Sequence, residues 1–256
     1  MTTELYFPNS QNPLIKLHTP FPGKPTHFVV QMVSLPENRV TIALVDAFTA
    51  ALDHIDNIYD NLSEADKDIG GCVITTSTGK FFSNGLDQQH SLGNPAFNKK
   101  FTPFLTRLLG FRLPTIAAVN GHAFAGGCMI ACAHDYIIMG SQRGYICMNE
   151  MLINVPLNSG TQNLIRTRVT SPRILNQIIL EARRFTADQA VEAGFVDQAV
   201  PNDKVFESAG KLADTLSHLP INRGLTFGLM KAEKNKTAIV TMMEKDAKPG
   251  SFLSKL

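Results

Sequence analysis

The chain has 256 residues, of which 44% are apolar and 18% are charged. This composition excludes a disordered chain, and the length suits one α/β domain. A net charge of +2 is too small to indicate nucleic acid or an anionic membrane surface as a partner. The chain has no run of about 18 apolar residues, so we expect no membrane span.

Residues 1–26 are polar and contain five prolines. Proline lacks the amide proton that helices and strands need, so this stretch predicts an irregular N-terminal arm.

From residue 27 onward, strand and helix patterns alternate. Short Val- and Ile-rich runs predict strands over residues 27–34, 72–76, 115–119, 135–139 and 194–197. Apolar residues spaced by three and four predict helices over residues 41–62, 97–109, 126–134, 172–180, 187–193, 201–218 and 223–243. This alternation predicts a layered α/β core over residues 27–200. We expect the helix-rich residues 201–253 to form a C-terminal region that packs on a neighbouring subunit.

The last three residues are Ser254, Lys255 and Leu256. This tripeptide is the address read by the peroxisomal import receptor. It predicts a peroxisomal location, with that receptor as a transient partner.

Two glycine-containing turns each follow a predicted strand. The first is FFSNGLD at residues 81–87, and the second is NGHAFAGGC at residues 120–128, which opens a helix. A helix N-terminus offers unpaired amides, and glycine allows close approach to the backbone. Two such turns facing each other could hold a developing oxyanion, although tight turning alone also explains the glycines. Neither turn has the spacing of a P-loop or a dinucleotide site.

Glu150 lies in the apolar stretch YICMNEMLI. Partial desolvation there would raise its pKa and make it a base near neutral pH, whereas a structural ion pair is the alternative interpretation. We interpret Asp87 and Asp135 as residues that cap the backbone.

The histidines and cysteines indicate little chemistry. His122 could line the site, and a Cys–His nucleophile pair (Cys128 or Cys132 with His122 or His134) is conceivable. The spacing of a metal site is missing, so we expect no metal.

Taken together, several segments resemble the enoyl-CoA hydratase/isomerase family, also called crotonases. They are PENR at 36–39, GKFFSNGLD at 79–87, PTIAAVNGHA at 114–123, GGC at 126–128, HDY at 134–136 and AVEAGFVD at 190–197. The resemblance implies a spiral of ββα units, with C-terminal helices that build a homotrimer or homohexamer. It also implies an acyl-CoA substrate whose thioester oxygen accepts hydrogen bonds from two backbone amides, those of Asn84 and Gly126.

Further site residues follow from the same resemblance. Those expected to frame the substrate are Ser83, Gly85, Leu86, Asp87, Gly127, Met129 and Asn149. Hydratases of the family carry two glutamates, but here the first position is Met129 and only the second, Glu150, is acidic. This pattern resembles the peroxisomal Δ3,Δ2-enoyl-CoA isomerases, which shift a double bond during fatty acid β-oxidation. The implied mechanism is a proton shuttle by Glu150 with no cofactor beyond the CoA of the substrate.

Some features depart from that pattern. Asn154 replaces a glycine usual in the family, and residues 157–162 partly resemble the loop of hydratases. Another crotonase reaction, such as hydration or thioester hydrolysis, and a non-catalytic acyl-CoA-binding protein therefore stay as alternatives. Lys231 is a candidate phosphate contact or a solvated helix lysine.

Overall fold

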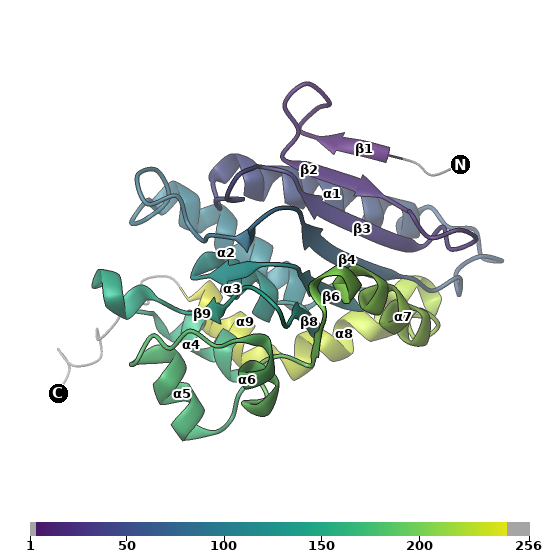
Figure 1. Cartoon of the computed structure of the whole chain (residues 1–256). Coiled ribbons are helices and arrows are strands. Elements are labelled where there is room, and N and C mark those ends of the chain that lie inside the picture. Colours follow the sequence, from purple (N-terminus) through teal and green to yellow (C-terminus); the bar gives the residue numbers. More distant parts are fainter. Residues whose placement is uncertain (1–3, 245–256) are drawn as a thin grey trace.

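The computed structural model describes residues 4–244 (Figure 1). Its main sheet has seven strands in the order β1-β2-β3-β4-β6-β8-β10. The strands from β3 onward pair in parallel, whereas β1 and β2 add an antiparallel hairpin at one edge. Their bounds are β1 Glu4–Phe7, β2 Ile15–His18, β3 His27–Met32, β4 Cys72–Ser77, β6 Thr115–Val119, β8 Tyr136–Gly140 and β10 Gln198–Val200.

The N-terminal hairpin corrects the prediction of an irregular arm over residues 1–26. Ile15 and Leu17 in β2 are buried while their neighbours are half-buried, which is the period of two expected of a strand with one covered face. The prolines fall between the strands, where they need no ladder hydrogen bond. The folded core therefore begins at β1 and not at residue 27.

A second, smaller sheet has the order β5-β7-β9, and its three strands are parallel. They are β5 Phe81–Ser83, β7 His122–Phe124 and β9 Ile146–Cys147, which the sequence patterns did not reveal because each is so short. Each follows a strand of the main sheet and precedes a helix, giving the units β4-β5-α2, β6-β7-α3 and β8-β9-η1. The helices are α2 Pro95–Leu109, α3 Gly126–Cys132 and the 3₁₀ turn η1 Glu150–Ile153. The predicted repetition of ββα units is confirmed.

Helices cover both faces of the main sheet. The helix α1, Ile42–Asp60, lies behind β2 and β3 in Figure 1, and its apolar stripe joins the larger core. The opposite face is covered by α7, Val205–Leu216, whose Val205, Ala209 and Ala213 pack with apolar residues of β3, β4, β6 and β8. Residues 205–216 thus belong to the core, contrary to the predicted boundary at residue 200.

The remaining helices lie on the lower side of Figure 1. They are α4 Ser159–Arg166, α5 Pro172–Ile179, α6 Ala187–Glu192, α8 Leu225–Lys234 and α9 Lys236–Met243, with short 3₁₀ turns η2 Asn202–Lys204 and η3 Asn222–Gly224. The long helix predicted over residues 223–243 is broken at Asn235, whose buried side chain donates to the Leu109 carbonyl. The strand predicted over residues 194–197 is a turn, because Gly194 adopts a φ of 70° and β10 starts only at Gln198.

Lys231 in α8 is neither solvated nor free for a phosphate. It is buried, and its ammonium group lies 2.6 Å from the Asp135 carboxylate and 3.2 Å from the Leu113 carbonyl. Asp135 also accepts hydrogen bonds from the backbone and side chain of Thr115. This pair ties α8 to the start of β6. Within residues 4–244, no helix is long and apolar enough to cross a membrane.

Candidate active site

The carboxyl ends of the three small-sheet strands lead to the two glycine turns and to Glu150. Because β5, β7 and β9 are parallel neighbours, these ends lie at one edge of the sheet. β5 runs into residues 84–86, β7 into residues 125–126, and β9 into residues 148–150. The fold therefore gathers segments that are far apart in the sequence at a single place.

The two glycine turns face each other in direct backbone contact. A Cβ on Gly85 would lie 2.7 Å from the Phe124 carbonyl oxygen and 3.3 Å from the Gly126 nitrogen. A Cβ on Gly127 would lie 2.4 Å from the Ser83 carbonyl oxygen. These are clashes with the main chain, so no larger residue fits without a shift of the backbone. The expectation that the turns face each other is confirmed.

At this contact, two of the backbone amides that have no acceptor within the described part of the chain come from different turns and lie close together. One is the amide of Gly126, the first residue of α3, which has no preceding helical carbonyl to donate to. The other is the amide of Leu86, which lies 3.4 Å from the ideal Cβ position of Gly126. The residue before the helix, Ala125, adopts φ 49° and ψ −117°, a region that is costly for any residue with a Cβ. Such strain is typical of a turn whose shape serves a ligand.

The prediction that Asn84 provides one of the oxyanion donors is wrong. Its backbone amide donates to the Glu37 carbonyl oxygen at 2.9 Å, and its side-chain amide donates to the Glu37 carboxylate at 2.9 Å. The amide that remains free is two residues further on, at Leu86. The sequence motif located the correct turn but not the correct residue in it.

Glu150 opens η1 and is only 5% exposed. Burial raises the pKa of its carboxyl group to about 7, opposed in part by a backbone hydrogen bond. Its Oε2 is buried without a hydrogen-bond partner among residues 4–244, and the same holds for Oδ1 of the neighbouring Asn149. The predicted desolvation of Glu150 is confirmed, and the alternative of a structural ion pair is not. A buried carboxylate with an unused oxygen is suited to accept a proton.

Met129 lies in the first turns of α3 and is 8% exposed. The whole of this helix is buried, and its sequence GGCMIAC contains no carboxylate. Cys128, beside Met129, is close enough to Glu150 for the carboxylate charge to raise the pKa of the thiol further, although burial is the main cause. The surroundings of Glu150 on this side are therefore sulfur-containing and apolar.

Two other predicted site residues have structural roles. Ser83 is fully buried, and its hydroxyl donates to the Asn38 carbonyl oxygen at 2.7 Å. Asp87 accepts hydrogen bonds from the backbone amides of Gln89 and His90. It caps its turn through Oδ1, as expected from the sequence.

The Cys–His nucleophile hypothesis is not supported. His134 hydrogen-bonds to the Thr75 hydroxyl and to the Ile130 carbonyl, each at 2.7 Å, and not to a thiol. His122 accepts from the Tyr145 amide at the opposite end of β7 from Gly126. All four cysteines are free and buried, and burial raises the pKa of Cys147 to about 12. The Cys147 thiol is therefore neutral near pH 7.

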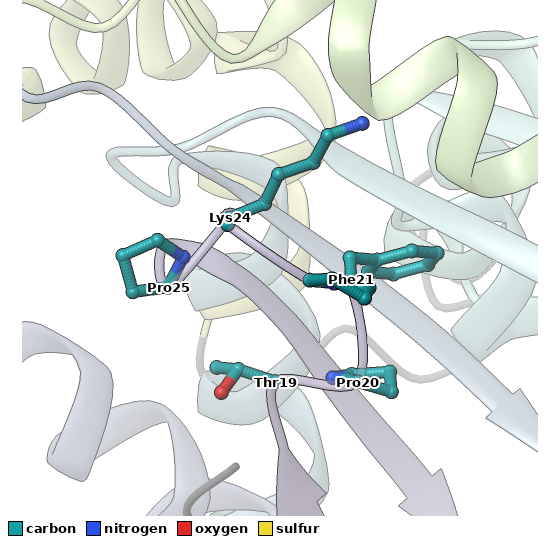
Figure 2. A pocket seen from close by; sticks show the side chains of 7 residues that line it. Thr19, Pro20, Phe21, Lys24 and Pro25 are labelled. Atoms are coloured by element: carbon teal, nitrogen blue, oxygen red, sulfur yellow. The ribbon is translucent and has the colours of Figure 1, made fainter. Parts of the chain in front are cut away.

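A cavity of about 360 Å³ lies far from this site, in the loop between β2 and β3. It is lined by residues 19–25 (Figure 2). Its only ionisable residue, Lys24, pairs with Asp214 of α7. Phe21 stacks on Phe206 with a 5.3 Å centroid separation, so the loop serves to anchor the N-terminal hairpin on α7. Residues 4–244 also contain no cluster of three or more His, Cys, Asp or Glu side chains that could hold a metal.

The family described as Enoyl-CoA hydratase/isomerase matches residues 36–247. The chain belongs to this family. Its crotonase fold agrees with the apo structure of an enoyl-CoA isomerase from Mycobacterium tuberculosis. The TM-score is 0.76 and the identity 22%, over 90% of this chain and 94% of the other.

Curated relatives of this crotonase include both isomerases and hydratases. The peroxisomal enoyl-CoA delta isomerase 1 of Arabidopsis thaliana is 33% identical over 195 residues, which cover 74% of this chain and 78% of the relative. A probable mitochondrial enoyl-CoA hydratase of Dictyostelium discoideum is 31% identical over 218 residues, which cover 84% of this chain and 75% of the relative. The family is thus established, whereas the choice between its reactions depends on the site itself.

Proposed function

We propose that this crotonase is a Δ3,Δ2-enoyl-CoA isomerase that uses Glu150 as its single base. The observation that carries the proposal is one buried carboxylate with a pKa raised to about 7 and an unpartnered oxygen, with Met129 where a second acid would stand. A proton shuttle needs one group that can both take and return a proton. A pKa near neutrality suits both halves of that task.

The reaction runs in two steps. The Glu150 carboxylate removes a proton from C2 of a 3-enoyl-CoA, and the electrons of that C–H bond delocalise into a dienolate with its charge on the thioester oxygen. The amides of Leu86 and Gly126 donate to that oxygen and stabilise the charge. The protonated Glu150 then delivers the proton to C4, which leaves the double bond between C2 and C3. No cofactor beyond the CoA of the substrate enters these steps.

Hydration is the second candidate, and the Dictyostelium relative named as a hydratase favours it. Adding water across C2 and C3 needs a group to position and activate the water. The loop at residues 157–162 motivated this alternative, but it contains the start of α4, capped by the Asn158 side chain. A non-catalytic acyl-CoA-binding protein is a third possibility, which any turnover would exclude.

The deciding experiment adds purified protein to a 3-enoyl-CoA and follows the ultraviolet absorbance of the conjugated 2-enoyl thioester. We expect a rise that Glu150→Gln reduces by about 100-fold or more. Glu192→Gln, at an exposed position of α6, is the control and should keep full activity. Mass analysis of the product separates the two reactions, because hydration adds one water and isomerisation leaves the mass unchanged. A hydrated product from the wild-type protein would contradict the proposal.

The cellular setting is part of the same proposal. Peroxisomal import through Ser254, Lys255 and Leu256 would place the enzyme with fatty acid β-oxidation; these residues lie outside the described part of the chain. The relative from Arabidopsis thaliana is named as peroxisomal, which supports this location. A fluorescent protein fused in front of the chain should enter peroxisomes and should stay in the cytosol when the last three residues are removed.

We also propose that the protein self-associates through its C-terminal helices. Large apolar side chains are exposed on and next to α8 and α9, namely Ile221, Leu225, Leu229, Met230, Val240 and Met243. Exposed apolar surface of this kind is typical of an interface between subunits. A homotrimer or homohexamer would cover it.

A further inference from the structure

The segment before α1 runs alongside the first glycine turn and is joined to it by backbone and side-chain hydrogen bonds. Within the described chain, residues 37–40 make such bonds with residues 81–87 at almost every step. We propose that Arg39, supported by Glu37, is a positioning residue that fixes the direction of the Leu86 amide. The inference rests on the proposed function, because it concerns the donors that hold the thioester oxygen.

Arg39 holds the turn on both sides of the critical peptide bond. Its Nη1 donates to the Asn84 carbonyl oxygen at 3.0 Å and to the Leu86 carbonyl oxygen at 3.2 Å. These two carbonyls flank the peptide bond between Gly85 and Leu86, whose N–H is the free donor. One guanidinium nitrogen therefore fixes the peptide units that precede and follow the donor.

Glu37 holds the guanidinium in turn. Its Oε2 accepts from Nε of Arg39 at 2.7 Å, and its Oε1 accepts from the side chain of Asn84. The hydrogen bond from Arg39 is the main reason why the pKa of Glu37 is lowered, so this carboxylate stays ionised at neutral pH. Asn84, which is not a donor to the oxyanion, is thus a link in the support of the turn.

The Leu86 N–H needs the hydrogen bonds of Arg39 to keep its direction, because the preceding residue, Gly85, is conformationally free. The Gly85 carbonyl accepts from the Val40 amide at 2.8 Å, and in a trans peptide the N–H of Leu86 then points to the opposite side, toward Gly126. Gly85 adopts a φ of 77°, a conformation that glycine can leave easily. Rotation of this peptide would remove the donor from the site. The contacts of Arg39 oppose that rotation, because they hold the carbonyls on either side.

The test compares recognition of the thioester carbonyl in wild-type protein and in Arg39→Met. Two unreactive ligands are used, a saturated acyl-CoA and the matching S-alkyl-CoA thioether, which lacks the carbonyl. We expect the wild-type protein to prefer the thioester by about tenfold and Arg39→Met to lose that preference through weaker thioester binding alone. The infrared carbonyl band of a 13C-labelled thioester should shift on binding to wild-type protein and shift less in the variant. Isomerase activity should fall about 100-fold.

Controls separate positioning from a general loss of stability. Arg168→Met removes another arginine that has contacts of the same kind away from the glycine turns. Arg168 donates to the Asp197 carboxylate and to the Asp135 carbonyl oxygen. It should lower the melting temperature and leave the thioester preference and the carbonyl band as in the wild type. Arg39→Lys keeps the positive charge without the planar guanidinium and should restore part of the preference.

The outcomes are distinct. If Arg39→Met keeps the full preference and the full carbonyl shift, Arg39 is not a positioning residue, whatever happens to the melting temperature. If the wild-type protein itself shows neither preference nor shift, the oxyanion site assigned to Leu86 and Gly126 is wrong, and this inference falls with it. If the wild-type protein shows both but does not isomerise a 3-enoyl-CoA, the proposed reaction fails while the role of Arg39 can still be measured.

Discussion

Asn84 gives both of its donors to Glu37, the backbone amide to the carbonyl oxygen and the side-chain amide to the carboxylate, each at 2.9 Å. This contact decides which amide of the turn can meet a ligand. With Asn84 occupied, the Leu86 amide is the one left beside Gly126.

The pKa of Glu150, raised to about 7 by burial, predicts the pH dependence of activity. The base must be ionised in the free enzyme, so kcat/KM should rise with pH, reach half its limit near pH 7 and be level above it. Below that value it should fall about tenfold for each pH unit. Initial rates with a 3-enoyl-CoA between pH 5 and 9 measure the profile. A half-maximum near pH 4.5 would mean that the carboxylate is not desolvated in solution.

The same group predicts how stability depends on pH. The pKa of Glu150 is about 7 in the folded protein and 4.5 in the unfolded chain, so the folded protein holds this proton more tightly. The resulting contribution to the free energy of unfolding is fully present below pH 4.5 and is lost as pH rises to about 7. The full shift corresponds to about 3 kcal/mol. Glu150→Gln cannot ionise, so its stability relative to the wild type should increase between pH 4 and pH 8. Urea unfolding of both proteins at several pH values checks this, and a constant difference across the range would contradict it.

Alanine at two adjacent glycines should separate activity from folding. A Cβ on Gly126 would lie 3.4 Å from the Leu86 nitrogen and 3.3 Å from its Cγ, so the methyl group fits once the flexible Leu86 side chain moves by a few tenths of an ångström, and it obstructs the free amide. Gly126→Ala should fold normally and lose activity about 100-fold. A Cβ on Gly127 would lie 2.4 Å from the Ser83 carbonyl oxygen, so Gly127→Ala should cost about 1 to 3 kcal/mol of stability. Thermal melts and rate assays on both variants give the comparison; equal melting temperatures would argue against the packing described.

Replacing Met129 by glutamate tests why this protein would isomerise and not hydrate. Met129 is 8% exposed, in the helix that Gly126 opens. A second carboxylate there could activate water, so Met129→Glu should form some hydrated product from a 2-enoyl-CoA, detected by mass. Met129→Gln, similar in size and polar but unable to act as a base, is the matched control. If both variants form the hydrated product equally, the carboxylate is not what separates the two reactions.

The exposed apolar side chains of α8 predict self-association. Leu229 and Met230 are 72% and 69% exposed. Placing glutamate at both positions should break an interface that buries them, because unpaired charges are costly to desolvate. Light scattering coupled to size-exclusion chromatography should show a smaller species than the wild type. Lys99→Glu, on the exposed side of α2, is the control and should leave the mass unchanged. A monomeric wild-type protein would refute the prediction.

The sequence by itself determined the elements whose signal is local. The helix α1 matches its predicted range closely because its apolar residues recur at helical spacing over many turns. The strand β6 matches its range because Pro114 precedes it and Asn120-Gly121 follows it. The desolvation of Glu150 was also predictable, because every neighbour within a few residues except Asn149 is apolar or aromatic. The resemblance to the crotonase family also predicts that the two glycine turns form one site, and their backbone contact agrees with it.

Tertiary structure alone decided what depends on partners distant in the sequence. The short strands β5, β7 and β9 pair with one another and have too few residues for a period. From the sequence, Lys231 is a candidate phosphate contact or a solvated lysine. In the fold, α8 places its ammonium group against the Asp135 carboxylate. The free amide is that of Leu86 and not of Asn84, because residues 37–40 occupy the hydrogen bonds of the rest of the turn. A motif records which residues are present, whereas the direction of an amide is set by the hydrogen bonds of its neighbours in space.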